Sequence, residues 1–534
     1  MKIRSDMLLV GLIILGGFLL RMIGINYGLP GIYHPDEPIV VSRAVDLVIN
    51  GKWNPKFFHW PSLLIYLLAL EYEIVYFFGF IIGKFRNLDD FFRFYLLDKG
   101  DFHLWGRVLV SSMSSMTGYY VYQILRITNG HKAGIIGLIM TESALLFVKH
   151  GQFVTPDIPA VFFSSIALFY LAKYIFQNEN RNYVLWAGVF IGLSAGMKYN
   201  FALILVPLLI ICLTNRKLSI RQKILLAIYS PALAALVFLA TNPFIIIDYK
   251  TFIFQFNEIS RHLAEGHIGM ESGRHPSLDL IIHLYKSSGF LFILTALAGI
   301  YTCERRNLIW AIALLSFPVI LIASHGRWPV TADRYSVPLV IFTILFSSDL
   351  LGSFLTGNRI LKVISYVLAA AITIQFLSLS ITQCIENTKT DTREVARKWI
   401  EANIPSGSKI GIEKNGPTLQ HAASEYKREP SYYYFDILPW FSTNYRGDDP
   451  LKLILENQPE YVITNSVVFA RYEPGSPAET QFPDVVKVWR RYYNALDKYG
   501  KVVFEVKPDK KTTGPIVRIY KIPGDLYSSL ELQK

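Results

Sequence analysis

The chain has 534 residues, of which 52% are hydrophobic and only 18% are charged. This composition excludes an ordinary soluble enzyme and indicates a protein whose solvent is the lipid bilayer. The net charge of +12 does not indicate nucleic-acid binding, because many basic residues stand in short loops between apolar segments. The three cysteines are far apart, a spacing that favours neither a disulfide framework nor a zinc motif.

The first apolar segment, residues 8–20, follows Lys2 and Arg4. It resembles a signal peptide, but no small-residue cleavage site follows before Asn26. We therefore expect an uncleaved first membrane span with a cytoplasmic N-terminus. Ten further apolar segments are expected to span the membrane. They lie at residues 106–125, 133–149, 158–176, 183–197, 199–213, 224–241, 278–300, 308–324, 335–352 and 360–383.

Basic residues collect in every second loop between these segments. They are Arg126, Lys132, Lys173, Arg181, Arg216, Lys217, Arg221, Lys223, Arg305, Arg306, Arg359 and Lys362. Since Lys and Arg are enriched in cytoplasmic loops, this pattern indicates the cytoplasmic face. The extracytoplasmic face then receives residues 26–60, 150–157, 242–277, 325–334 and the tail after residue 385.

One more apolar segment, residues 61–83, does not fit this alternation. A full crossing here would place the loop after the first span and the loop near residue 157 on opposite sides of the membrane. The segment also carries Glu71 and Glu73, and carboxylates are costly in lipid unless they face protein or water. We predict a re-entrant or interfacial helix.

The tail from residue 385 onward is polar and is predicted to form a small α/β domain. Its expected helices lie at residues 393–403 and 485–499, and its expected strands at 409–413, 461–465, 501–506 and 515–522. The tail sequence has no glycine-rich phosphate loop or metal motif, which favours acceptor recognition or support over chemistry. The predicted fold is thus a polytopic α-helical membrane domain of about eleven spans, residues 1–384, and an extracytoplasmic α/β domain, residues 385–534.

The most informative motif follows the first span directly and consists of His34-Pro35-Asp36-Glu37-Pro38. The two prolines restrict the backbone and hold two adjacent carboxylates at the membrane–water boundary. A partly desolvated carboxylate at such a place can act as a general base. A solvated turn with a helix cap would explain the same residues.

An acidic pair directly after the first span, followed much later by a second acid, Asp157, resembles the GT-C glycosyltransferases. The likeness is to the protein O-mannosyltransferase and lipid A aminoarabinose transferase group, and it extends from residue 1 to about residue 385. It implies that Asp36 is the catalytic base, with Glu37 beside it.

The resemblance extends to other outer loops. It implies acceptor binding or orientation of a neighbour for Asp157, although a helix cap would also explain this residue. It implies stabilisation of a departing phosphate for Lys198, for which a snorkelling interfacial lysine is the alternative. Arg334, with Tyr335 beside it, is the expected phosphate clamp, and a salt bridge between Arg334 and Asp333 is the alternative.

Two histidines, His34 and His59, are further candidates for substrate binding. A single proline, Pro61, follows His59 where the family carries a proline pair. The case for a substrate-binding role of His59 is therefore weaker. The outer loop of residues 242–276 is rich in groups that can ligate zinc. It holds His262, His267, His275, Glu258, Glu265 and Glu271. No established metal motif is present in this loop, so an acceptor-facing loop is favoured. The motifs imply no cofactor and no metal, although some members of the family bind a metal and a divalent ion stays an alternative.

These features predict an inverting glycosyltransferase of the cell membrane that acts on the extracytoplasmic side. The expected partners are a polyprenyl-phosphate-linked sugar, a lipid, glycan or protein acceptor, and the bilayer, without nucleic acid. A transporter or flippase is the second hypothesis and would favour charges within central spans and half-helix repeats. A polymerase or ligase of surface polysaccharide is the third. The acid directly after the first span favours the glycosyltransferase.

Overall fold

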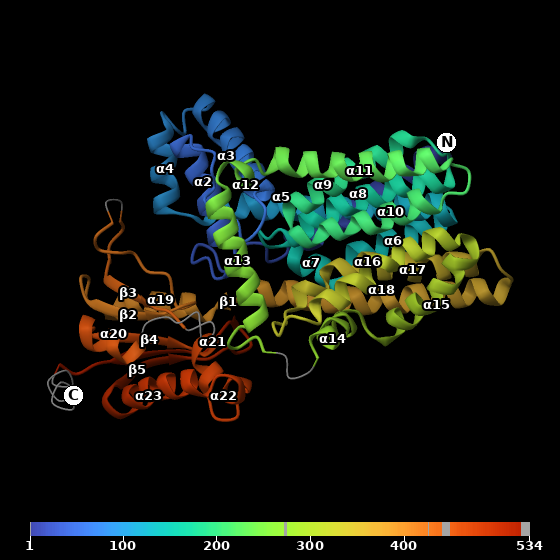
Figure 1. Ribbon diagram of the computed structural model, residues 1–534. Helices are drawn as coiled ribbons and strands as arrows, with labels where there is room; N and C mark the ends of the chain where they lie inside the picture. The colour runs from blue at the N-terminus through green and yellow to red at the C-terminus, as the bar shows by residue number, and fades with distance from the viewer. Residues whose placement is uncertain (1, 272–274, 425–426, 440–448, 525–534) are drawn as a thin grey trace.

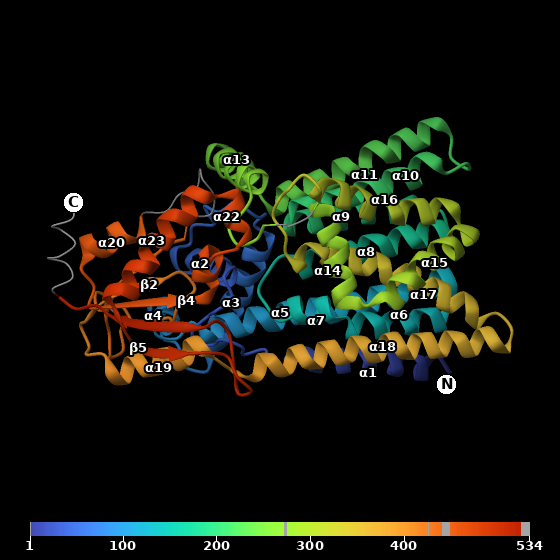
Figure 2. The ribbon, with the colours of Figure 1, turned by 90° about the horizontal axis from the view of Figure 1, so that it is seen from below.

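A computed structural model describes residues 2–271, 275–424, 427–439 and 449–524. Long helices packed side by side form one part of the molecule, and a smaller α/β domain lies at one end of them (Figure 1). Helix α1 begins at the end of the bundle farthest from this domain (Figure 2). The bundle helices are α1 (Lys2–Met22), α5 (Gly100–Asn129), α6 (His131–Ser143), α7 (Leu145–Gly151), α8 (Asp157–Phe176), α9 (Arg181–Met197), α10 (Leu205–Thr214), α11 (Ile220–Thr241), α14 (Pro276–Ser288), α15 (Phe290–Arg306), α16 (Leu308–His325), α17 (Val337–Leu355) and α18 (Arg359–Thr388).

The predicted membrane domain is confirmed as mostly helical, but its eleven spans are not. By length and hydropathy, six helices in the described part of the chain can cross a membrane, or eight if each of two sharply bent helix pairs forms one span. Several predicted segments lie in the bundle as shorter helices. Helix α9 has 17 residues, and the apolar helix at Tyr199–Thr214 is shorter still. A full crossing needs roughly 20 residues, which such helices do not supply.

The segment predicted to be re-entrant or interfacial forms helix α3 (Leu63–Ile81). In Figure 1 it lies with α2 (Glu37–Asn50) and α4 (Leu88–Leu97) beside the end of the bundle that carries the α/β domain. Its length and composition also suit a crossing, so the interfacial position stays a prediction. At its end, Phe77 and Phe78 are each 59% exposed, as expected of side chains that contact lipid.

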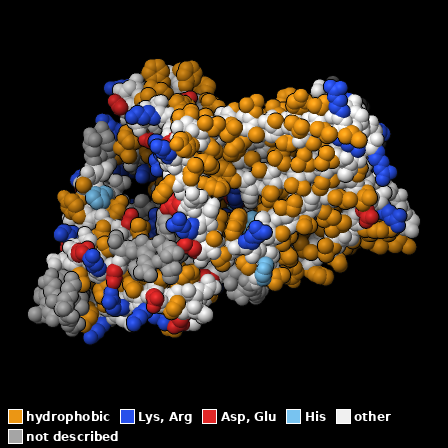
Figure 3. All heavy atoms as spheres, in the orientation of Figure 1, with side chains coloured by type: hydrophobic (Ala, Val, Ile, Leu, Met, Phe, Trp, Pro, Cys, Tyr) orange, Lys and Arg blue, Asp and Glu red, His pale blue; other side chains and the backbone are white. Residues whose placement is uncertain are grey.

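The bundle has an apolar outer surface and closely packed helices inside. Hydrophobic side chains cover most of the face of the bundle that Figure 3 shows. Small residues let helices approach closely where they cross. A Cβ atom on Gly299 of α15 would lie only 1.9 Å from the carbonyl oxygen of Phe346 in α17, and one on Gly192 of α9 only 2.4 Å from that of Ala234 in α11. Larger side chains at these glycines would push the helices apart.

The C-terminal domain is built on a five-stranded sheet in the order β3-β2-β4-β7-β5. Strands β3, β2 and β4 are parallel, whereas β7 and β5 are antiparallel to their neighbours. The strands are β2 (Lys409–Glu413), β3 (Tyr433–Ile437), β4 (Tyr461–Asn465), β5 (Lys501–Val506) and β7 (Val517–Lys521), and a separate small pair joins β1 (Thr390–Asp391) to β6 (Thr512–Thr513). The helices are α19 (Thr392–Asn403), α20 (Pro450–Asn457), α21 (Ser466–Phe469), α22 (Pro477–Gln481) and α23 (Pro483–Tyr499).

Apolar cores lie on both faces of this sheet. Ile463 of β4 packs into the core that holds Ile400 of α19, whereas its neighbour Val462 belongs to the core that holds Trp489 of α23. Successive strand residues point to opposite faces, so a sheet covered on both sides has continuous apolar strands. The predicted α/β character of the tail is therefore confirmed.

A buried carboxyl group, Glu413, ends strand β2 and makes this domain sensitive to pH. Burial raises the pKa of Glu413 to about 8, although the Asn465 N–H and the Tyr493 hydroxyl donate hydrogen bonds of 2.9 and 2.8 Å to it. Because this pKa lies above the usual 4.5, the free energy of unfolding should fall as pH rises from about 5 to about 8.

We therefore expect Glu413→Gln to raise the melting temperature of the domain at pH 9 but hardly at pH 5. Thermal unfolding followed by tryptophan fluorescence measures both values, since Trp489 lies in the adjoining core. The matched control is Glu456→Gln on the exposed face of α20. An equal change in melting temperature at the two pH values would contradict the assignment.

The C-terminal domain is docked onto the loop that follows α1. The Tyr27 hydroxyl donates a 2.8 Å hydrogen bond to Asp391, and Arg393 forms an ion pair of 2.7 Å with the same carboxylate. Arg393 also donates to the carbonyl oxygen of Tyr33 at 3.3 Å. Asp391 and Arg393 are both buried. The domain thus adjoins the motif around Asp36 at the end of the bundle.

Candidate functional site

The candidate site begins with Asp36, which occupies the N-cap position of α2. Its side chain makes no capping hydrogen bond. Instead, its carboxylate contacts the guanidinium of Arg334, in the short helix η2 (Asp333–Ser336) that precedes α17. The side chains of Asp36 and Arg334 are 23% and 26% exposed, so both are reachable from outside. The predicted base and the predicted phosphate clamp are therefore direct neighbours.

A second acid–base pair joins Asp157 and Lys198. Asp157 is the first residue of α8, Lys198 is the C-cap residue of α9, and their side chains form an ion pair. This ion pair accounts for Asp157 without the helix-cap alternative. The ammonium group of Lys198 lies 5.4 Å from the centre of the Tyr335 ring, and the guanidinium of Arg334 lies 5.5 Å from it. Both cations thus lie close to the same aromatic ring.

Asp333 forms its ion pairs with other residues, and Arg334 pairs with Asp36 instead. Lys149 forms a 2.5 Å ion pair with one oxygen of Asp333, and His150 lies 3.4 Å from the other. The neutralisation of Arg334 by Asp333, one alternative at the sequence level, does not occur in the described contacts. Lys149 is a functional candidate that sequence reasoning missed, although its position shortly before Asp157 offered a signal.

Glu37, predicted to act with Asp36, has different surroundings. Its carboxylate receives hydrogen bonds of 2.8 and 2.5 Å from Arg107 and one of 2.8 Å from the Val154 N–H. Both Glu37 and Arg107 are fully buried. Burial raises the pKa of Glu37, but the charge and hydrogen bonds of Arg107 outweigh burial and bring the pKa below its usual value. A catalytic role for Glu37 stays a prediction, and its contacts favour positioning.

Arg107 of α5 links the segments around the site. Besides Glu37, it donates hydrogen bonds of 2.7 and 2.8 Å to the carbonyl oxygens of Ile25 and Tyr27. It therefore ties the loop after α1 to the start of α2 and, through Glu37, to the turn before α8. Sequence reasoning missed this role. Arg107 matches a basic position of the family that the motif around Asp36 resembles, but a lone arginine at the start of a span is common.

We expect Arg107→Met to destabilise the protein by about 3–5 kcal/mol, because it leaves the Glu37 charge buried without a partner. Thermal unfolding of the purified protein in detergent should show a clear drop in melting temperature. The double variant Arg107→Met/Glu37→Leu removes the orphaned charge as well and should recover much of the loss. A single variant as stable as the wild type would show that this pair does not hold the loops.

The two predicted histidines lie at the margin of the site. The imidazole of His34 accepts a 3.3 Å hydrogen bond from the Asp36 N–H and stacks on Phe153, with ring centres 4.4 Å apart. Burial lowers the pKa of His34, which makes it a neutral support for the Asp36 backbone. The imidazole of His59 lies 3.1 Å from the Glu258 carboxylate in α13 (Tyr249–Glu265). His59 therefore joins the loop between α2 and α3 to α13.

The histidine-rich outer loop does not form a metal centre in the part of the chain that the structure describes. There, no three His, Cys, Asp or Glu side chains are placed to hold one ion. The Nδ1 atom of His267 lies 3.1 Å from the Nε2 atom of His262. Burial lowers the pKa of both imidazoles. His275 caps α14. The lowered pKa values favour the neutral form of His262 and His267.

Solved structures of known proteins share the fold of this chain. Residues 95–246 match the family model of dolichyl-phosphate-mannose-protein mannosyltransferases. The whole structure is similar to ArnT from Cupriavidus metallidurans bound to undecaprenyl phosphate, with 13% identity and a TM-score of 0.57, over 96% of this chain and 97% of that one. The chain has the GT-C fold. No curated protein sequence matches the chain.

The same GT-C fold appears in a second solved structure, the archaeal oligosaccharyltransferase AglB from Archaeoglobus fulgidus in complex with an inhibitory peptide and a dolichol-phosphate. The identity is 13% and the TM-score 0.50, over 97% of this chain and 77% of that one. The GT-C fold that the acidic motif implied is therefore confirmed.

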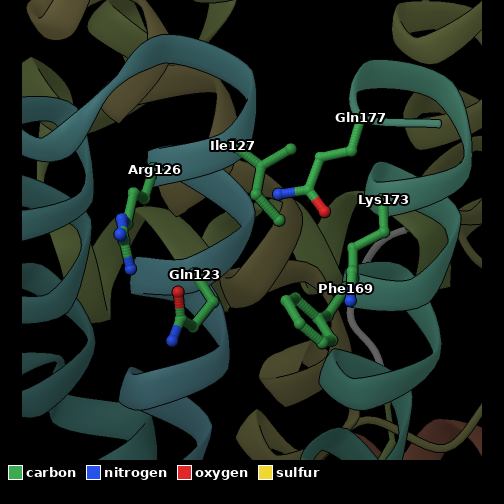
Figure 4. A pocket seen from close by; sticks show the side chains of 6 residues that line it. All are labelled: Gln123, Arg126, Ile127, Phe169, Lys173 and Gln177. Carbon is green, nitrogen blue, oxygen red and sulfur yellow. The ribbon is translucent and has the colours of Figure 1, made fainter.

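A pocket in the helix bundle lies between α5 and α8. It has a volume of about 350 Å³ and is lined by Gln123, Arg126, Ile127, Phe169, Lys173 and Gln177. In Figure 4, Arg126 points away from Lys173 and Gln177, so the cations do not converge on one point. Figure 3 also shows the surface hollowed between the C-terminal domain and the helices beside the bundle, with charged side chains along the edge of the hollow.

Proposed function

We propose that the protein is a membrane glycosyltransferase that moves a monosaccharide from a polyprenyl phosphate to a hydroxyl acceptor on the extracytoplasmic side. The observation that carries the proposal is the contact between Asp36 and Arg334, beside the pair of Asp157 and Lys198. A base and two cations thus meet at one end of an apolar bundle. Basic residues in alternate loops support the extracytoplasmic placement.

The reaction needs these groups in two roles. The Asp36 carboxylate accepts the proton of the acceptor hydroxyl while the oxygen attacks the anomeric carbon of the sugar. The bond between that carbon and the phosphate oxygen breaks, and the electron pair leaves with the polyprenyl phosphate. Attack from the face opposite the leaving group inverts the anomeric configuration. Protonated Asp36 then returns its proton to solvent.

Arg334 serves both the base and the donor. Without donor, Arg334 is paired with Asp36. A phosphate group competes for Arg334, because guanidinium binds phosphate through two parallel hydrogen bonds. Donor binding would thereby free Asp36 to accept a proton. Lys198, oriented by Asp157, adds the second positive charge for the leaving phosphate.

The acceptor in this proposal is a hydroxyl group on a lipid, a glycan or a protein. The charged hollow beside the C-terminal domain supports acceptor entry from the aqueous side, while the apolar bundle leaves the isoprenoid in lipid. Glycosyl transfer, rather than transport, is favoured because the charged residues of the site lie at helix ends and pair with one another.

The test is a transfer assay with purified protein in lipid vesicles and polyprenyl phosphates that carry labelled mannose or aminoarabinose. Label should move from the lipid to an acceptor hydroxyl only when the protein is present, and the product should have inverted anomeric configuration. Label that crosses the bilayer while still attached to its carrier would support a flippase instead. A product of retained configuration would rule out the single displacement.

A further inference from the structure

The loop between α13 and α14 is anchored in the core of the C-terminal domain. Ile268 is fully buried in the cluster that holds Trp489 and Tyr472 of that domain. Arg471 donates hydrogen bonds of 3.1 Å to the Ile268 carbonyl oxygen and of 2.7 Å to that of Val467. A membrane-domain residue therefore completes the apolar core of the other domain.

The shape of this loop requires glycine on either side of Ile268. Gly266 and Gly269 have φ angles of 96° and 87°, which side chains with a Cβ atom rarely adopt. A Cβ atom on Gly269 would lie 2.7 Å from the Arg471 side chain. One on Gly266 would lie 3.4 Å from Pro329 and 3.8 Å from Phe482. The loop is thus packed between the C-terminal domain and the segment that precedes η2.

The same loop pairs with the segment that carries Arg334. The Thr331 N–H donates a 3.0 Å hydrogen bond to the carbonyl oxygen of Met270. Glu271 and Val330 form an antiparallel bridge. The Thr331 hydroxyl also lies 3.1 Å from the imidazole of His283 in α14. Arg334 follows Thr331 by three residues, so a continuous set of contacts runs from the C-terminal domain to the cation that touches Asp36.

We propose that the C-terminal domain sets the affinity of the site for the donor phosphate by holding Arg334 in place through Ile268. Ile268 and Arg471 are then positioning residues, which touch neither substrate nor base. This inference rests on the proposed function, because it takes Arg334 as the phosphate-binding group. It gives the C-terminal domain a role in donor binding, in addition to any contact with the acceptor.

Binding of undecaprenyl phosphate to the purified full-length protein tests the proposal. Ile268→Asp should weaken binding about tenfold or more, because it places a charge in an apolar core and releases the loop. Arg471→Gln, which leaves the apolar core intact, should weaken binding about three- to tenfold. Ile268→Val should stay within about twofold of the wild type. Val502→Asp, at an exposed position of the same domain, is the matched control.

A double-mutant cycle with Arg334→Leu separates positioning from general damage. Once Arg334 is absent, Ile268→Asp and Arg471→Gln should weaken binding no further, whereas damage unrelated to Arg334 would remain additive. If thermal unfolding shows that Ile268→Asp unfolds the domain, Arg471→Gln decides. Unchanged affinity in Arg471→Gln and a folded Ile268→Asp would overturn the inference and leave the proposed function standing. A wild-type protein that binds neither undecaprenyl phosphate nor dolichol-phosphate would instead overturn the proposed function.

Discussion

Asp36→Asn is expected to lower the turnover number of glycosyl transfer by about a hundredfold to ten-thousandfold, the usual contribution of a general base. The asparagine side chain keeps the shape of aspartate but cannot accept the acceptor proton. At the same time, the variant should bind undecaprenyl phosphate at least as tightly as the wild type. The reason is that Asp36 competes with the phosphate for Arg334 in the free protein.

The opposite directions of these two effects make the assignment testable. Steady-state assays give the turnover number, and a binding titration gives the affinity for the carrier. Asp46→Asn is the matched control, because Asp46 is an exposed acid of the same helix, α2. Its carboxylate accepts a hydrogen bond from the Asn50 side chain. Turnover in Asp36→Asn close to that of Asp46→Asn would exclude Asp36 as the base. Loss of carrier affinity together with turnover would point to a role in binding.

Arg334→Leu is expected to have the second-largest effect, with both carrier affinity and turnover falling. Loss of a cation that stabilises a leaving group commonly costs about a hundredfold to a thousandfold in rate. Arg334→Lys should recover only part of the loss, since an ammonium group binds phosphate as a point charge without the planar pair of donors. Initial rates at varied donor concentration separate the effects on KM and on kcat.

The control for this prediction is Arg327→Leu, which removes an exposed arginine from the same loop. It should leave both parameters near their wild-type values, because Arg327 does not contact Asp36 in the described structure. If Arg334→Leu retains the wild-type KM for the donor, then Arg334 serves only to pair with Asp36. Lys198 would in that case be the main phosphate-binding group.

The sequence predicted the regular parts of the C-terminal domain well. The expected strands at 409–413, 461–465 and 501–506 have the same bounds as β2, β4 and β5. The β-branched residues of these strands and the flanking turns carry a local signal. Strand β3 was missed, because its sequence, three aromatic residues followed by Asp436 and Ile437, shows no clear alternation of polar and apolar residues.

The candidate site was predicted as a set but not as pairs. Charge in the loops was enough to place Asp36, Asp157, Lys198 and Arg334 on one face, and the structure brings these residues together. Which acid meets which cation depends on tertiary contacts between distant segments. Asp333 and Arg334 are adjacent in sequence, yet successive residues of a helical turn point in different directions, and each finds its own partner.

Asp36 and Glu37, the adjacent acids of the first loop, show the same limit of prediction from sequence. Successive residues at a helix start point about 100° apart, so one side chain can face the site while the next enters the core. Asp36 is partly exposed and Glu37 fully buried. The partner of Glu37, Arg107, stands 70 residues away in the chain and had no recognisable motif.

The most direct test is a single-turnover measurement with donor and acceptor bound at saturation to wild-type and Asp36→Asn protein. Saturation removes differences in binding, so the rate reports the transfer step alone. The account predicts that the wild type converts its bound labelled donor to an inverted glycoside and polyprenyl phosphate, while Asp36→Asn transfers at least about a hundredfold more slowly. Equal single-turnover rates for the two proteins would contradict it.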